Sequence, residues 1–178
     1  MAARTLILMA GLPGSGKTTL ATALAARIDA AVMNKDMIRS ALFQGKRLEY
    51  SGKQDDFVMR IMLQGAEYSF AQQNASAVIL DGRTFSRRYQ LDTCATFAAQ
   101  MNATLRIIEC MVSDDTVQRR LQDDVGKHPA QNRNFALYLE VKMRFEPITY
   151  PKLVVDTQQP LETCVQQCVT YLKQAEAQ

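Results

Sequence analysis

Short apolar runs alternate along this chain with longer stretches in which apolar residues recur every three or four positions. The short runs predict five buried strands, at residues 6–10, 31–33, 77–80, 105–111 and 153–155. The periodic stretches predict helices at residues 17–28, 38–43, 55–73, 87–101, 114–121 and 160–173. Strands that alternate with helices in this way form parallel sheets with both faces covered. The pattern therefore predicts an α/β fold of three layers, in which a five-stranded parallel sheet has helices on both faces.

Composition narrows the class of protein without naming its function. With 178 residues, of which 47% are hydrophobic and 22% charged, the sequence fits one globular domain over residues 1–178. The formal net charge of +3 suits a polyanionic ligand such as a nucleotide, but it is too small to indicate a nucleic-acid-binding protein. The four cysteines form no CxxC pair, so we expect reduced, buried thiols rather than a metal site. No apolar run is long enough to span a bilayer, and we expect a cytoplasmic protein.

The most specific motif lies between the first predicted strand and the first predicted helix. Residues 11–18 read GLPGSGKT, which is the spacing of a phosphate-binding P-loop. Glycines let successive backbone N–H groups point at one anion, and the helix N-terminus adds partial positive charge. Lys17 would then reach the β- and γ-phosphates, while the Thr18 hydroxyl would coordinate Mg²⁺. The motif predicts a P-loop NTPase fold with an ATP site made by Gly11, Leu12, Pro13, Gly14, Ser15, Gly16, Lys17, Thr18 and Thr19.

A carboxylate ends the third predicted strand. Residues 77–81 read AVILD, an apolar strand followed directly by Asp81. P-loop proteins use such a carboxylate to hold the second side of the magnesium shell. Its alternative role is that of a turn-forming residue before Gly82. We predict Thr18 and Asp81 as the metal-binding residues.

A second group of polar residues follows the second predicted strand, where residues 34–39 read NKDMIR. In α/β folds the carboxyl ends of the strands face the ligand crevice. Asp36 could therefore accept the proton of an acceptor hydroxyl, and Arg39, one helical turn later, could clamp an anionic part of that acceptor. On spacing alone, a helix-capping Asp36 and a solvated Arg39 explain the pattern about equally well.

Four stretches together resemble the P-loop kinases that include the 5′-polynucleotide kinases, chloramphenicol phosphotransferase and the zeta toxins. These stretches are GLPGSGKTTL, NKDMIRSAL, AVILDGRTFSRRYQ and LVVD, and they extend through most of the chain. The resemblance implies that Asp36 is a general base and that Arg39 binds an acceptor phosphate. It also implies a functional arginine after the third strand, represented here by Arg87 or Arg88. In this segment, DGRTFSRRYQ, the pair Gly82-Arg83 differs from the residues that are more common in the family.

Kinases of this family close an arginine-bearing lid over the triphosphate, which implies a lid at about residues 119–134. Arg119 and Arg120 resemble the first lid arginine, with Arg119 as a nucleotide contact and Arg120 as a catalytic charge. The family's second lid arginine is expected about four residues later, where acidic residues stand instead. Lys127 or Arg133 could take its place.

These residues predict an ATP- and Mg²⁺-dependent phosphotransferase that moves the γ-phosphoryl group to a hydroxyl. A small molecule or nucleotide-like hydroxyl is the favoured acceptor. A nucleic-acid 5′ end is less favoured, because the polar stretch at residues 44–54 offers only three basic side chains. The alternative is a nucleotide-dependent switch or regulatory NTPase with no acceptor, which the absent second lid arginine supports.

Overall fold

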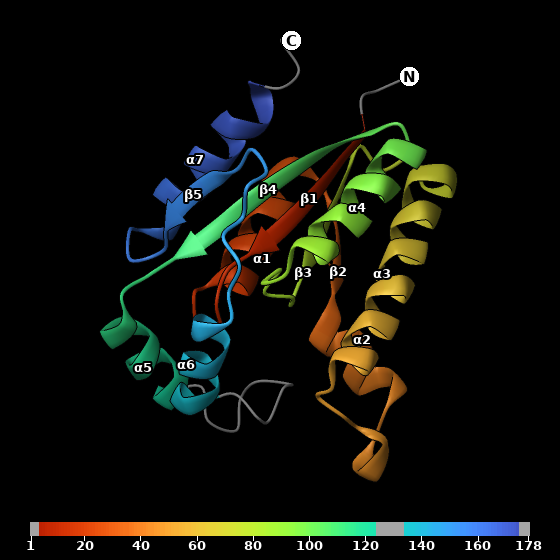
Figure 1. The fold of residues 1–178 in the computed structure, drawn as a ribbon. Helices are drawn as coiled ribbons and strands as arrows, with labels where there is room; N and C mark the ends of the chain where they lie inside the picture. Colours follow the sequence, from red (N-terminus) through yellow and green to blue (C-terminus); the bar gives the residue numbers. More distant parts are fainter. Residues whose placement is uncertain (1–3, 124–133, 175–178) are drawn as a thin grey trace.

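The computed structural model describes residues 4–123 and 134–174, in which strands and helices alternate as Figure 1 shows. The strands are β1 (Arg4–Ala10), β2 (Ala31–Asn34), β3 (Ala77–Asp81), β4 (Ala103–Met111) and β5 (Leu153–Asp156). The α-helices are α1 (Lys17–Ile28), α2 (Lys35–Leu42), α3 (Gly52–Gln72), α4 (Arg88–Gln100), α5 (Asp114–Asp123), α6 (Phe135–Met143) and α7 (Leu161–Lys173). A short 3₁₀ turn, η1 (Gly45–Arg47), lies between α2 and α3.

The five strands form one parallel sheet in the order β2-β3-β1-β4-β5. β1 lies at the centre and pairs with β4 along its whole length. The register of β2 on β3 places Asn34 opposite Asp81. Because every strand runs in the same direction, the loops that follow β1, β2 and β3 all leave the sheet at its carboxyl edge. That edge gathers the segments predicted to carry the chemistry.

Alternating side chains of β1 divide the core into two halves. Leu6, Leu8 and Ala10 belong to the half that packs against α3 and α4, whereas Ile7 and Met9 belong to the half that packs against α1 and α7. All five are fully buried, so the strand is a continuous apolar run and not an alternating one. Figure 1 shows the resulting three layers, with α1 and α7 on one face of the sheet and α3 and α4 on the other.

The helices α5 and α6 lie beyond the carboxyl edge of the sheet instead of covering one of its faces (Figure 1). Val117, Leu121 and Tyr138 form a small cluster of buried side chains that joins these two helices, and Leu12 packs against it. The α5–α6 pair is thereby anchored to the loop that follows β1.

The sequence-based prediction of the fold class and of the five strands is confirmed, and the six predicted helices are present with small differences in their ends. Helix α2 begins three residues earlier than predicted, because the Asn34 side chain caps it by accepting a hydrogen bond from the Met37 amide at 2.9 Å. Helix α6 was not predicted, since its sequence FALYLEVKM is apolar on nearly every side and has no helical period. Within residues 4–123 and 134–174, every helix is too short or too polar to cross a bilayer.

Candidate active site

The loop between β1 and α1 has the backbone conformation of an anion-binding P-loop. Gly11 and Gly16 adopt φ values of +129° and +84°, in the region that side chains disfavour. A Cβ atom on Gly11 would lie 2.4 Å from the carbonyl oxygen of Cys110, so this position has no room for a side chain. The loop ends at Gly16, directly before the first turn of α1. Backbone N–H groups and the helix N-terminus therefore converge at the mouth of the loop.

Lys17 folds back onto this loop. Its side-chain Nζ donates hydrogen bonds of 2.8 Å to the carbonyl oxygens of both Gly11 and Leu12, and it lies 3.5 Å from the Ser15 hydroxyl oxygen. The residue is only 9% exposed, yet it lines the main cavity of the site. The ammonium group is thus placed where phosphate oxygens could replace the loop carbonyls as its acceptors.

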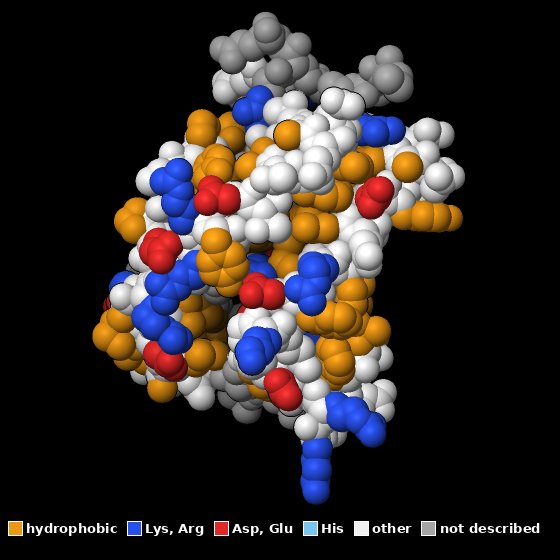
Figure 2. All heavy atoms as spheres, turned by 45° about the vertical axis from the view of Figure 1, so that its right-hand side comes forward, with side chains coloured by type: hydrophobic (Ala, Val, Ile, Leu, Met, Phe, Trp, Pro, Cys, Tyr) orange, Lys and Arg blue, Asp and Glu red, His pale blue; other side chains and the backbone are white. Residues whose placement is uncertain are grey.

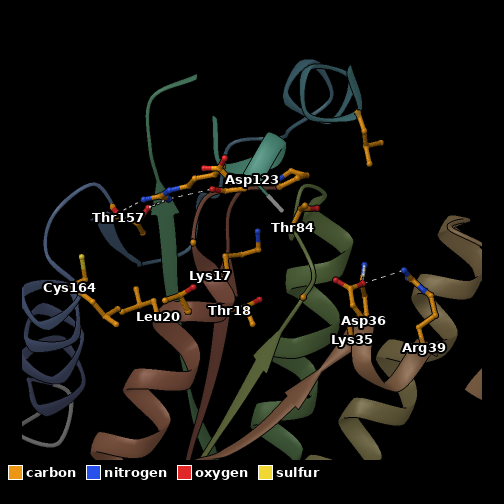
Figure 3. Close-up of a pocket in the computed structure, with 18 of the residues that line it drawn as sticks. Lys17, Thr18, Leu20, Lys35, Asp36, Arg39, Thr84, Asp123, Thr157 and Cys164 are labelled. Carbon is orange, nitrogen blue, oxygen red and sulfur yellow. Dashed lines mark hydrogen bonds and ion pairs between the residues drawn. The ribbon is translucent and has the colours of Figure 1, made fainter. Parts of the chain in front are cut away.

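One cavity of about 720 Å³ opens above the loop, and Figure 3 shows the side chains that line it. In that view Lys17 and Thr18 lie in the middle, with Thr157 and Cys164 on one side and Lys35, Asp36 and Arg39 on the other. The residues around the P-loop are Pro13, Gly14, Gly16, Lys17, Thr18, Thr19, Leu20, Arg120, Asp123, Leu137, Thr157, Gln159, Leu161 and Cys164. The opposite wall consists of Lys35, Asp36, Arg39, Tyr50, Asp55, Gly82 and Thr84. We call this second wall the acceptor wall.

Asp81, at the end of β3, is fully buried beneath the cavity. Its Oδ2 accepts a hydrogen bond of 2.7 Å from the Asn34 side-chain amide of the neighbouring strand. In the described part of the chain, no donor lies within hydrogen-bonding distance of its Oδ1. A buried carboxylate oxygen without a partner is unfavourable, and a cation relieves this cost. The Asp81 carboxylate and the exposed Thr18 hydroxyl are both oxygen donors of the kind that Mg²⁺ prefers.

Such an ion would share its coordination shell with phosphate oxygens. Over residues 4–123 and 134–174, three or more His, Cys, Asp or Glu side chains nowhere gather into a group that could hold a metal ion. P-loop proteins need no such group, because the nucleotide itself supplies ligands. Asp81 does not line the cavity directly, whereas Gly82 and Thr84 of the following segment do.

On the acceptor wall, two cations and two carboxylates are in direct contact. Asp36 Oδ1 lies 3.4 Å from Arg39 Nη1 and 3.8 Å from Lys35 Nζ. Asp55, in the first turn of α3, accepts a hydrogen bond of 3.1 Å from Lys35 Nζ and forms an ion pair with Arg39 Nη2. Burial lowers the pKa of Lys35 from 10.5 to about 8, against the opposing effect of Asp36, and burial also lowers the pKa of Arg39. The sequence prediction paired Asp36 with Arg39 but missed Lys35 and Asp55.

Tyr50 and Arg83 complete this side of the site. The Arg39 guanidinium lies 5.4 Å from the centre of the Tyr50 ring, in a cation–π contact. Arg83, which is 4% exposed, donates to Asp56 Oδ1 at 2.5 Å from a position just after β3. Sequence reasoning did not select Tyr50, because an aromatic residue in a polar loop is more often a packing residue. The only sequence signal for Arg83 was the unusual Gly-Arg pair after Asp81.

Arg120 and Arg119 differ sharply in position. Arg120 lines the cavity and donates hydrogen bonds to Thr157 at Oγ1 (3.0 Å) and at the carbonyl oxygen (2.7 Å). The Thr157 hydroxyl in turn donates to the Ser15 carbonyl oxygen at 2.8 Å, so the β5–α7 loop fixes Arg120 to the P-loop. Arg119 is exposed and is not among the cavity-lining residues. Adjacent helical residues point about 100° apart, so one helix directs only one of them at the site.

Several predicted residues support the loop without lining the cavity. Gly11, Leu12 and Ser15 lie in or under the P-loop and are not part of the cavity wall, whereas Pro13, Gly14, Gly16, Thr18 and Thr19 are. Arg87 forms an ion pair with Glu146 at 3.0 Å and Arg88 is exposed, so neither lines the cavity. Residues 124–133, which include most of the predicted lid with Lys127 and Arg133, lie outside the described residues.

Solved structures with the same architecture include several kinases. A protein of Chloroflexus aurantiacus that is proposed to be a kinase aligns with a TM-score of 0.75 at 20% identity, over 94% of this chain and 98% of the other. A gluconokinase of Sinorhizobium meliloti 1021 aligns with a TM-score of 0.68 at 15% identity, over 98% and 95%. The APS kinase CysC of Mycobacterium tuberculosis, solved with AMPPNP and APS, aligns with a TM-score of 0.69 at 15% identity, over 97% of this chain and 99% of the other. At these identities the likeness shows the fold, which is the P-loop NTPase fold of these kinases.

Sequence comparison identifies the family. None of the curated proteins is significantly similar to this chain. The family model described as an AAA domain matches residues 6–148, a range that runs from β1 past α6 and includes the P-loop and the acceptor wall. Because this match covers most of the sequence, the chain belongs to the AAA domain family.

Proposed function

We propose that this protein is an ATP-dependent phosphotransferase that moves the γ-phosphoryl group to a hydroxyl of a small molecule. One observation carries the proposal: Lys17 and Thr18 of the P-loop and the carboxylate of Asp36 line the same cavity from opposite sides. A nucleotide switch needs only the first of these two halves. A transferase needs both, because donor and acceptor must be held together for direct transfer.

In this proposal the donor half binds the triphosphate. The loop amides and the N-terminus of α1 hold the phosphates, and Lys17 and Arg120 stabilise the charge that develops during transfer. Thr18 and Asp81 would hold Mg²⁺, which neutralises the phosphate oxygens when bound. Arg119 does not line the cavity, so its proposed contact with the nucleotide depends on its place at the start of the predicted lid. Because ATP is the donor, we expect the protein to act in the cytoplasm.

The acceptor half supplies the proton transfer. Asp36 accepts the proton of the acceptor hydroxyl as its oxygen attacks the γ-phosphorus, while the bond from that phosphorus to the β–γ bridging oxygen breaks and ADP leaves. Arg39 and Lys35 hold Asp36 in place through the contacts described above. This division of labour agrees with the resemblance to 5′-polynucleotide kinases, zeta toxins and chloramphenicol phosphotransferase, which supports a hydroxyl as the acceptor.

The test is phosphoryl transfer from ATP and Mg²⁺ to a panel of hydroxyl compounds and 5′-hydroxyl oligonucleotides, with phosphorylated products identified by mass spectrometry. Asp36→Asn is expected to lower transfer by roughly 10²–10⁴-fold, the range typical of a general base. Asp29→Asn is the matched control, because Asp29 is exposed and has a φ of +53° that Asn also tolerates. Near-normal transfer by Asp36→Asn would exclude Asp36 as the base. ATP hydrolysis without any phosphorylated product would instead identify a nucleotide-dependent switch.

A further inference from the structure

The cations beside the proposed acceptor position are already neutralised by the protein. Asp55 contacts both Lys35 and Arg39, and Asp36 contacts Arg39 at 3.4 Å. Arg83, whose positive charge acts on both of these cations, has its own partner in Asp56. Each cation of the group therefore has a carboxylate in contact, and the acceptor wall presents no excess positive charge to a ligand.

Exposure differs between the two kinds of charge. The Arg39 and Lys35 side chains are 3% and 10% exposed, whereas those of Asp36 and Asp55 are 14% and 27% exposed. On the acceptor side of the cavity the carboxylates, Asp55 above all, are therefore more accessible to a ligand than the two cations. Asp55 is the most exposed of the four and contacts both cations. On the face of the molecule that Figure 2 shows, Lys and Arg side chains are interspersed with Asp and Glu side chains.

This arrangement disfavours an anionic acceptor. A phosphate, sulfate or carboxylate group here would approach Asp36 and Asp55, or would have to break the contacts of Asp55 with Lys35 and Arg39. Like charges placed together are a common means of excluding a wrong ligand. Uncharged hydroxyl groups, in contrast, donate hydrogen bonds to carboxylates at no electrostatic cost. The Tyr50 ring, which also lines the cavity, adds an apolar surface for the carbon skeleton of such a compound.

We infer that the acceptor is an uncharged polyhydroxy compound, and that Asp55 is the residue that excludes anionic acceptors. This inference rests on the proposed phosphotransferase function for its reaction, but its claim about charge selectivity has a test that requires no turnover.

The binding test uses inorganic sulfate as the anion and the protein saturated with AMPPNP and Mg²⁺, so that the P-loop is blocked. We expect the wild type to bind sulfate weakly, and Asp55→Asn to bind it roughly tenfold more tightly because Lys35 and Arg39 are released. Glu67→Gln is the matched control, since Glu67 is exposed on the same helix and the change removes the same charge away from the cavity. Asp55→Glu keeps the charge and should behave like the wild type. Equal sulfate affinity of Asp55→Asn and Glu67→Gln would overturn the inference.

The transfer test compares uncharged acceptors with related anionic ones: glucitol with gluconate, adenosine with adenosine 3′-phosphate, and glycerol with glycerol 1-phosphate. We expect the wild type to have the higher kcat/KM for the uncharged member of each pair, and Asp55→Asn to shift this ratio toward the anion by roughly tenfold or more. A wild-type preference for the anionic members would refute the inference while leaving the phosphotransferase function intact. Failure to phosphorylate any compound, combined with the expected sulfate result, would refute the function but not the charge selectivity of the wall.

Discussion

Lys35 is a buried cation, and its titration offers a quantitative test of the acceptor wall. Its Nζ lies 3.1 Å from Asp55 Oδ1 and 3.8 Å from Asp36 Oδ1, and its side chain is 10% exposed. Burial lowers its pKa from 10.5 to about 8, although Asp36 acts in the opposite direction. Lys35→Met removes the charge and keeps an unbranched side chain of similar length. Comparing this variant with the wild type isolates the free energy of burying the charge.

The effect of Lys35 on stability follows from its pKa in the folded protein, about 8, and its pKa in the unfolded chain, 10.5. Below pH 8, Lys35 is charged in both the folded and the unfolded chain, and the lowered pKa corresponds to about 3 kcal/mol of lost stability. Between pH 8 and 10.5 the folded protein has released the proton while the unfolded chain still binds it. In that window the free energy of unfolding therefore gains about 1.4 kcal/mol per pH unit from this group. Above pH 10.5 the penalty is gone.

Urea unfolding followed by circular dichroism between about pH 7 and about pH 10.5 measures this linkage. Below pH 8, the free energy of unfolding of Lys35→Met minus that of the wild type should be constant. Between pH 8 and 10.5 the wild type should gain about 3 kcal/mol of stability relative to the variant. Lys53→Met, which removes a lysine at an exposed position in the first turn of α3, is the control variant. A difference that stays constant from pH 8 to 10.5 would refute the conclusion that burial lowers this pKa.

Two further predictions concern the donor half, and a third concerns the packing of the core. Gly11→Ala should abolish nucleotide binding and lower the free energy of unfolding by roughly 2–4 kcal/mol. The reason is that the new Cβ would lie 2.4 Å from the Cys110 carbonyl oxygen. An unchanged Tm in a thermal melt would contradict this prediction. Thr157→Val should weaken AMPPNP binding by about tenfold, because Arg120 and the Ser15 carbonyl both lose their hydrogen bond to the Thr157 hydroxyl. Isothermal titration calorimetry measures the affinity. Equal affinity of the variant and the wild type would argue against the role of Thr157 in holding Arg120 at the P-loop. All four cysteines are buried, and burial raises the pKa of Cys110 to about 12. Ellman's reagent should accordingly label the folded protein slowly and all four thiols after unfolding, whereas rapid labelling of the native protein would contradict the packing.

Local sequence was sufficient for much of the fold and for the donor half. The apolar runs predicted β1 and β3 because these strands are buried between two helical layers. The edge strands β2 and β5 are only partly buried, but their apolar residues were still enough to predict them. The glycine spacing in GLPGSGKT predicted the loop, since its backbone conformation depends on the residues of the loop itself. The proximity of Asp36 and Arg39 followed from one turn of helix. In each case the determining interactions lie within a few residues of each other.

Selection between neighbouring residues required the three-dimensional structure. The sequence offered Arg119 and Arg120 as equivalent candidates, and the packing of α5 through Val117 and Leu121 turns only Arg120 toward the P-loop. Thr157, which fixes Arg120, follows β5 far along the chain and carries no motif. Its role depends on β5 lying beside β4 at the edge of the sheet.

The sequence by itself determined that this chain forms a parallel α/β sheet with a P-loop and places a carboxylate after the second strand. Only the tertiary structure decided the chemistry of the acceptor wall. Asp55 reaches Lys35 and Arg39 from the start of α3, and Tyr50 covers Arg39 from the preceding loop. The physical reason is that backbone conformation is set by neighbouring residues, whereas the net charge of a cavity is a sum over side chains that packing brings together from separate elements.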